Sequence, residues 1–160
     1  MPKLNDIEEL NTLQYLLGLK AVARSGWLRV GLHNTESVAD HSWGVALLAC
    51  ALCPDNLDRT RVLEMAILHD LAERTVGDIT PFDGITPDEK HAAEKKAMKT
   101  LCESLKQGDR WLAIFDEYTR QQSEEARFVH QMDKLDMHMQ AEIYQATTQI
   151  NLEEFMKPFK

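Results

Sequence analysis

Apolar residues recur at three- and four-residue steps along most of the chain, which is the periodicity of helices with one buried face. Between positions 7 and 23, Leu10, Leu13 and Leu17 form such a stripe and predict an amphipathic helix that ends near Ser25. The same pattern predicts five further helices, at about 38–53, 59–74, 88–106, 111–118 and 123–150. The pattern therefore favours an all-α fold.

Polar and helix-breaking residues separate these segments. An irregular stretch is expected at 26–37, and the run from Gly77 to Pro87 contains two glycines and two prolines. This run is predicted to be a loop, and such loops often carry functional residues. No repeat, low-complexity tract or linker divides the chain. We therefore expect residues 1–160 to form a single compact bundle of about six main helices.

Composition places the chain among globular proteins and limits the classes of partner that it is expected to bind. Of 160 residues, 44% are hydrophobic and 28% charged, which suits one domain with one core. Lys and Arg number 18 against 26 Asp and Glu, so a broad electropositive face for nucleic acid is not expected. No apolar stretch approaches the roughly 20 residues of a membrane helix, and the acidic start does not fit a secretion signal. We therefore expect a cytoplasmic protein without nucleic-acid or membrane partners.

A His-Asp dipeptide, His69-Asp70, follows four apolar residues in the predicted helix at 59–74. The dipeptide alone is weak evidence because it also arises by chance. Its setting is more informative, since an unpaired carboxylate in an apolar interior is costly and calls for a nearby cation. Glu73 lies four positions after His69 and three after Asp70, on the same side of a helix. These three residues are therefore candidates for a cation site.

Two further candidates lie on other predicted helices. His41 interrupts an otherwise apolar segment, and Asp133 lies in the last helix. With His69 and Asp70 they would supply two imidazoles and two carboxylates, a donor set suited to a divalent ion that keeps positions open for water. Spacing alone does not select Asp133 over Asp136, and it does not exclude His130 or His138. A buried His beside a carboxylate, taken singly, is more often a hydrogen-bonded core residue than a metal ligand.

The ordered set of His41, His69-Asp70, Glu73, Asp78 and Asp133 resembles the HD-domain phosphohydrolase superfamily, and specifically its family of small 5′-deoxynucleotidases. The matching stretches cover most of the chain: GW at 26–27, ESVADHSW at 36–43, HDLAERTVGDITP at 69–81, KHAAEKKAM at 90–98, DEYTRQQSEEARFVHQMDKLDM at 116–137 and QAEIY at 140–144. The resemblance implies an HD-domain helical bundle.

The resemblance also implies roles for individual residues. The principal metal ligands would be His41, His69, Asp70 and Asp133. Glu73 would be the catalytic glutamate and Asp78 a loop acid beside the substrate, and both, with the main chain of Ile79, would hold any second ion. Trp27 would border the sugar and help to exclude a 2′-hydroxyl. Glu36 also matches the family, without an assigned role.

The phosphate contact is the one departure from the pattern. Some members of the family have an Arg directly before the Trp, and here that position is Gly26. A dianionic phosphate in so acidic a protein needs a neighbouring cation. The candidates are Arg24, Arg29, Lys90 and Lys134, and Arg29 is the predicted contact.

The activity implied is the metal-dependent removal of the 5′-phosphate from deoxyribonucleoside 5′-monophosphates, with Co²⁺, Mn²⁺ or Mg²⁺ as cofactor, by a homodimer. Two alternatives stay open. The same ligands would also suit hydrolysis of another nucleotide or phosphoester, such as a phosphodiester or a triphosphate. In the second alternative, the chain is a non-catalytic helical interaction module whose polar cluster is only structural.

Overall fold

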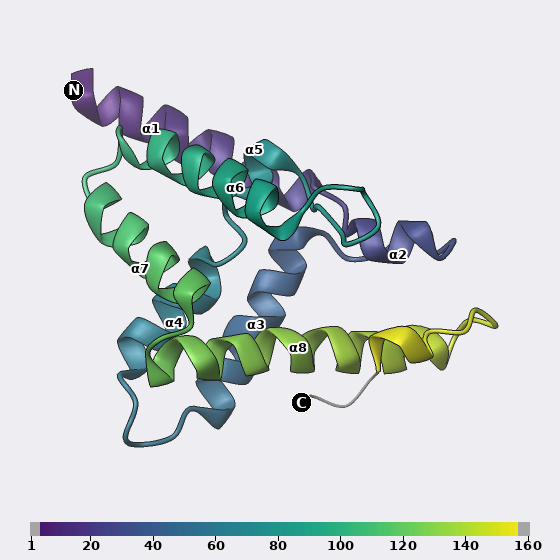
Figure 1. Cartoon of the computed structure of the whole chain (residues 1–160). Coiled ribbons are helices and arrows are strands. Elements are labelled where there is room, and N and C mark those ends of the chain that lie inside the picture. Colours follow the sequence, from purple (N-terminus) through teal and green to yellow (C-terminus); the bar gives the residue numbers. More distant parts are fainter. Residues whose placement is uncertain (1–3, 157–160) are drawn as a thin grey trace.

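A computed structural model describes residues 4–156, and every regular element in this range is a helix (Figure 1). The elements are α1 (Leu4–Leu17), η1 (Gly18–Ala21), α2 (Ser25–Arg29), α3 (Val38–Leu52), α4 (Arg59–Leu68), α5 (Glu73–Val76), α6 (Pro87–Cys102), α7 (Gly108–Arg120), α8 (Glu124–Gln145) and η2 (Glu153–Phe155), where η denotes a 3₁₀ helix. The predicted all-α bundle is confirmed. Within residues 4–156, no helix is both long and apolar enough to cross a membrane.

Helix α3 is the central element of the bundle. It packs against α4 and α8, and its residues Val38, Val45 and Ala49 are fully buried. They form one core with side chains from α4 and α8, including Met65 and Val129. Because α3 is enclosed in this way, a polar side chain on its inner faces is held in one position by its neighbours.

Helices α3 and α6 each begin at a capping box. The hydroxyl of Ser37 accepts a hydrogen bond from the Asp40 amide, while the Asp40 carboxylate accepts one from the Ser37 amide. Thr86 and Glu89 form the same reciprocal pair at the start of α6. Such boxes satisfy amide groups that the first helical turn leaves unpaired. They therefore fix where α3 starts and where the loop before α6 stops.

The N-terminal region differs from the expected single helix over 7–23. Helix α1 ends at Leu17, and α2 begins at Ser25, inside the stretch expected to be irregular. Tertiary packing explains α2, because Trp27 is buried between the rings of Tyr144 and Phe155. The periodicity of five residues could not indicate a helix that is held mainly by contacts with α8 and the C-terminal segment.

The helix predicted at 59–74 divides in two. Helix α4 ends at Leu68 and α5 begins at Glu73. Between them the backbone tightens to three-residue hydrogen bonds, from the Leu71 amide to the Leu68 carbonyl and from the Glu73 amide to the Asp70 carbonyl. As a result, Asp70 lies in a turn and not on a continuous helical face.

Two other helices end earlier than predicted. Helix α6 ends at Cys102 and not near 106, because the chain turns so closely that a Cβ on Gly108 would lie 1.9 Å from the Cys102 carbonyl oxygen. Helix α8 ends at Gln145 and not near 150. The segment beyond it folds back, and the Leu152 amide donates to the Gln145 side chain (2.9 Å). Figure 1 shows η2, in yellow, lying along the end of α8.

Candidate active site

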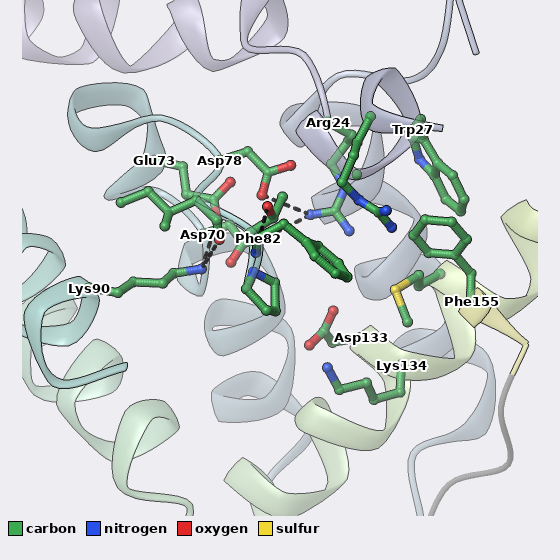
Figure 2. A pocket seen from close by; sticks show the side chains of 16 residues that line it. Arg24, Trp27, Asp70, Glu73, Asp78, Phe82, Lys90, Asp133, Lys134 and Phe155 are labelled. Atoms are coloured by element: carbon green, nitrogen blue, oxygen red, sulfur yellow. Dashed lines mark hydrogen bonds and ion pairs between the residues drawn. The ribbon is translucent and has the colours of Figure 1, made fainter. Parts of the chain in front are cut away.

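Most of the residues singled out from the sequence line one pocket (Figure 2), although the buried rings of His41 and His69 are not among its lining residues. Its walls come from α2, the loop at 77–86, α6, α8 and the C-terminal segment, and its volume is about 230 Å³. A hollow of this size accommodates part of a small molecule and not a macromolecule. In Figure 2, Asp70, Glu73 and Asp78 gather on one side of the pocket, and Asp133 faces them from α8.

His41 projects from α3 toward the base of the pocket and is fully buried. Its Nδ1 lies 2.6 Å from Asp136 Oδ2, and since a carboxylate cannot donate, the Nδ1–H is the donor. Its Nε2 faces the other way, 3.2 Å from Asp133 Oδ1 and 3.6 Å from Asp70 Oδ2. Nδ1 is thus hydrogen-bonded to the carboxylate of Asp136, while Nε2 faces the carboxylates of Asp133 and Asp70.

His69 has the same division of roles between its nitrogens. Its Nδ1–H donates to the Ala66 carbonyl (2.8 Å), and its Nε2 lies 3.2 Å from Asp70 Oδ2. One ligand atom from each of His41, His69 and Asp70 lies within 4.8 Å of the other two. His69 and Asp70, which are neighbours in the chain, thus meet at one point in the turn between α4 and α5.

The last helix supplies the fourth candidate ligand. Asp133 brings Oδ1 to His41, and its Oδ2 accepts a hydrogen bond from the hydroxyl of the partly buried Tyr118 (3.2 Å). The alternatives left open by spacing lie elsewhere: Asp136 contacts the other nitrogen of His41, and His138 pairs with Glu142 (3.4 Å). His130 contacts Gln121 and comes within 4.0 Å only of the Asp133 oxygen that Tyr118 already occupies.

The donor set fits a divalent metal ion. The Nε2 atoms of His41 and His69 are buried and make no hydrogen bond with any residue of the described range 4–156. Unsatisfied buried nitrogens are costly, and both face carboxylate oxygens at short range. Two imidazoles and two carboxylates form a mixed set that suits a divalent ion. A cation among these four groups would satisfy both nitrogens at once.

Without a cation, protons compensate for part of the clustered negative charge. Burial alone would lower the pKa of His41, but its close contacts with the carboxylates of Asp133 and Asp136 outweigh burial and raise the pKa to about 9. Although burial acts in the opposite direction, the two histidines hold the pKa of Asp70 and that of Asp133 below their usual range. Burial would lower the pKa of His69 too, but Asp70 and Asp133 raise it, so metal binding at the two imidazoles would release protons.

Glu73 is the most perturbed carboxyl group of the pocket. It is buried, and burial together with the charges of Asp70 and Asp78 raises its pKa to about 10. The Lys90 ammonium lies 3.9 Å from its Oε1, while Oε2 has no hydrogen-bond partner within residues 4–156. A carboxyl group that holds a proton beside a substrate pocket is suited to proton transfer.

The loop residues expected around a second ion have partners within the chain. Asp78 Oδ2 accepts a hydrogen bond from the Ser25 amide (2.7 Å), which joins the loop to the start of α2. The Ile79 carbonyl accepts one from the Lys90 ammonium (2.9 Å). Lys90 therefore places a positive charge between Glu73 and the Ile79 carbonyl.

Trp27 and Arg29 both line the pocket but differ in how closely other side chains enclose them. The Trp27 indole donates from Nε1 to Glu36 Oε1 (2.9 Å) and is enclosed by other rings. Arg29 pairs with Glu154 (2.7 Å), and its guanidinium carbon lies 3.8 Å from the centre of the Phe82 ring. Arg29 thus lies at the rim of the pocket, with its charge already paired.

Arg24 is the cation at the base of the pocket. Its guanidinium lies 3.8 Å from the carboxylates of Glu36, Asp70 and Asp78, in each case beyond hydrogen-bond distance. Its side chain is only 14% exposed. Sequence reasoning named Arg24 as an alternative to Arg29, and no local pattern distinguished the two. The contacts of Asp136 and Tyr118 were also missed, although Asp136 lies one helical turn after Asp133.

Comparison with known proteins agrees with this arrangement. The HD domain family model matches residues 17–160. The chain is 39% identical over 138 residues to 5′-deoxynucleotidase HDDC2 of Mus musculus, covering 85% of this chain and 69% of that protein. It is 34% identical over 154 residues to 5′-deoxynucleotidase hdd1 of Schizosaccharomyces pombe, covering 92% and 76%.

A solved structure extends the comparison to three dimensions. The crystal structure of a protein from Pyrococcus horikoshii aligns with a TM-score of 0.81 at 35% sequence identity, over 91% of this chain and 84% of that one. The fold, the matched length and the sequence identity point to one ancestry, and the resemblance seen in the sequence is confirmed. The chain belongs to the HD-domain family and, within it, to the family of the 5′-deoxynucleotidases.

Proposed function

We propose that this protein is a metal-dependent phosphohydrolase that removes the 5′-phosphate from deoxyribonucleoside 5′-monophosphates. The observation that carries the proposal is the pair of buried, unpartnered Nε2 atoms of His41 and His69, facing Asp70 and Asp133 at the base of a pocket. The relatives in mouse and fission yeast are named for this activity. A purely structural polar cluster, as in an interaction module, would not leave both nitrogens unsatisfied.

The metal would be held by His41, His69, Asp70 and Asp133. When bound there, a divalent ion polarises a phosphoryl oxygen and lowers the pKa of water. Carboxylate oxygens favour Mn²⁺ or Mg²⁺, and imidazole nitrogens favour later transition ions such as Co²⁺. We therefore assign the cofactor to this group of three ions.

Glu73 would act on the attacking water. Its Oε2 is buried and unpartnered within the described chain. In the metal-free protein Glu73 holds a proton, and a bound cation would lower its pKa, so that the carboxylate would then orient the water and accept its proton. Asp78 would position the loop beside the substrate through its bond to the Ser25 amide. The second ion implied at Glu73, Asp78 and Ile79 stays a prediction, and it would have to displace the Lys90 ammonium from the Ile79 carbonyl.

Arg24, and not Arg29, is our choice for the phosphate contact. Arg29 is paired with Glu154 at the rim, whereas the Arg24 guanidinium is largely shielded from solvent and has no carboxylate oxygen closer than 3.8 Å among its ion pairs. A phosphate bound at the base of the pocket would receive a shorter, charge-assisted bond from Arg24. Arg29 and Phe82 would then face the part of the nucleotide farther from the phosphate.

Trp27 would form the wall beside the sugar. Its bond to Glu36 and its contacts with Tyr144 and Phe155 prevent the indole from moving aside. A fixed wall discriminates against an added hydroxyl group better than a mobile one does, because the extra atom cannot be accommodated. This rigidity supports a preference for deoxyribose over ribose.

We also propose that the protein is a homodimer. Four large apolar side chains are exposed on α3 and α8, two helices that pack against each other: Trp43, Leu47, Met139 and Ile143. Exposed apolar groups of this size often mark an interface between proteins. The expected cytoplasmic location stays a prediction.

The proposed activity predicts phosphate release from deoxyribonucleoside 5′-monophosphates with Co²⁺ or Mn²⁺, and slower release from the ribonucleotides. Asp70→Ala should reduce release to background, because a metal ligand is lost. The assay is a phosphate measurement across deoxy- and ribonucleoside monophosphates, triphosphates and a phosphodiester. The control variant Asp116→Ala, which changes an acidic residue of α7 outside the pocket, should keep full activity. Full turnover by a folded Asp70→Ala protein would contradict the mechanism.

The metal-free protein should become less stable as the pH rises from 6.5 to 9. Over this range His41, with a pKa of about 9 against an ordinary 6.5, and Glu73, at about 10 against 4.5, hold protons that the unfolded chain has released. Their stabilisation is complete below the unfolded pKa and is lost as the pH passes the folded one. The midpoint of thermal unfolding, measured in a chelating buffer across this pH range, reports the loss of stability, and Glu73→Gln should make its decline shallower. A midpoint that stays constant or rises with pH would refute the prediction.

Arg24→Gln should lower kcat/KM for a deoxynucleoside monophosphate by about 10- to 100-fold, since a hydrogen bond between charged groups contributes about 1.5–3 kcal/mol. The matched variant Arg29→Gln should change it by less than about threefold, because that side chain lies at the rim. Steady-state kinetics on both proteins, with metal content measured alongside, gives the comparison. A larger loss in Arg29→Gln would restore Arg29 as the phosphate contact.

The dimer proposal predicts a mass of twice 18.3 kDa by sedimentation equilibrium. Trp43→Glu should shift the protein toward the monomer, because a buried unpaired carboxylate opposes association. Leu10→Glu, at an exposed apolar residue of α1, serves as the control and should leave the mass unchanged. A monomeric wild type would rule the proposal out.

A further inference from the structure

Two carboxylates of α8 contact opposite nitrogens of one imidazole. Asp133 and Asp136 are three residues apart and therefore lie on the same side of the helix. The first approaches His41 Nε2 at 3.2 Å, and the second approaches His41 Nδ1 at 2.6 Å. Their chemical roles differ, because only the Nε2 side is shared with His69 and Asp70.

The contact with Asp136 selects one form of the His41 ring. A carboxylate only accepts hydrogen bonds, so Nδ1 keeps its hydrogen and the lone pair of the neutral ring is on Nε2. The 2.6 Å contact also limits rotation of a ring that is fully buried. Nε2 is thereby directed toward the proposed metal position.

Gly44 provides the space for this carboxylate. It lies within α3, three residues after His41, and a Cβ at this position would be 2.0 Å from Asp136 Oδ1. Glycine inside a helix is less favourable than alanine by about 1 kcal/mol. The close approach of Asp136 is a physical reason for a glycine here, since any side chain would displace the carboxylate.

The two histidines are oriented by different means. His69 donates to the main-chain carbonyl of Ala66 in its own helix, a contact supplied by any sequence that folds this way. His41 depends on the side chain of Asp136, which comes from another helix. The orientation of His41 is therefore the one that a substitution can remove without deleting a ligand.

We propose that Asp136 is a positioning residue that fixes the ring form and direction of His41 for metal binding, and that Gly44 is required because it leaves room for Asp136. This inference rests on the proposed metal centre but not on the proposed substrate. Groups that hold a metal-binding His in this way affect metal affinity about 10- to 100-fold. The effect should therefore appear in metal binding itself, without any turnover.

The test is a titration of the chelator-treated protein with Co²⁺. Binding is measured by calorimetry and by the visible absorption spectrum of the bound ion. Asp136→Asn is nearly isosteric, but its amide can donate to Nδ1 and favour the wrong ring form. We expect Co²⁺ to bind 10- to 100-fold more weakly to this variant, with an altered spectrum. Asp136→Glu, which keeps a carboxylate, should recover part of the affinity.

Gly44→Ala tests the second half of the proposal. It should weaken Co²⁺ binding in the same direction, and the double variant Gly44→Ala/Asp136→Asn should be no weaker than the more affected single variant, because both changes remove one contact. Ser42→Ala is the matched control on α3. Its hydroxyl is buried beside His41 in sequence without a hydrogen-bond partner in residues 4–156, so Co²⁺ affinity should stay within twofold.

Several outcomes would overturn the inference. Wild-type affinity and spectrum in a folded Asp136→Asn protein would show that His41 needs no orienting carboxylate. Additive losses in the double variant would show that Gly44 does not act through Asp136. A wild type that binds no Co²⁺ would remove the metal centre itself, whereas failure to hydrolyse deoxynucleotides with Co²⁺ bound would refute only the proposed substrate.

Discussion

Negative charge enclosed at one point is the constraint on which this structure depends. Asp70, Glu73, Asp78 and Asp133 lie around the base of a single pocket, and their mutual repulsion grows as water is excluded. The chain compensates in part with the guanidinium of Arg24 and the ammonium of Lys90. Protons on His41 and Glu73 compensate further when no metal is present. The clustered negative charge thus favours a bound cation.

Well-packed helices and less regular segments supply different parts of the proposed site. The proposed metal ligands come from α3, from the turn after α4 and from α8, which pack on one another through the main core. The residues proposed to contact substrate come from short or irregular pieces, namely α2, the loop at 77–86 and the segment around η2. A firmly packed scaffold thus holds the reacting centre, and changes in the surrounding pieces can alter specificity without disturbing it.

The sequence predicted the long elements well because their apolar periodicity records burial directly. It missed α2, whose five residues are held by rings from α8 and the C-terminal segment, and it joined α4 to α5 because the turn at 69–72 keeps a helical pattern. At the site, residue chemistry indicated His41, His69 and Asp70, and the family resemblance singled out Asp133. The difference between Arg24 and Arg29 could not be predicted, because it depends on Glu154, a residue 125 positions away.

The order in which the chain is synthesised bears on the contact between α3 and α8. Synthesis runs from the N-terminus, so His41, His69 and Asp70 leave the ribosome well before Asp133 and Asp136. Until α8 emerges, the His41 imidazole has neither of its α8 carboxylates, and the side of α3 that faces α8 has no cover. The proposed metal centre therefore lacks Asp133, one of its four ligands, until the last long helix has been made.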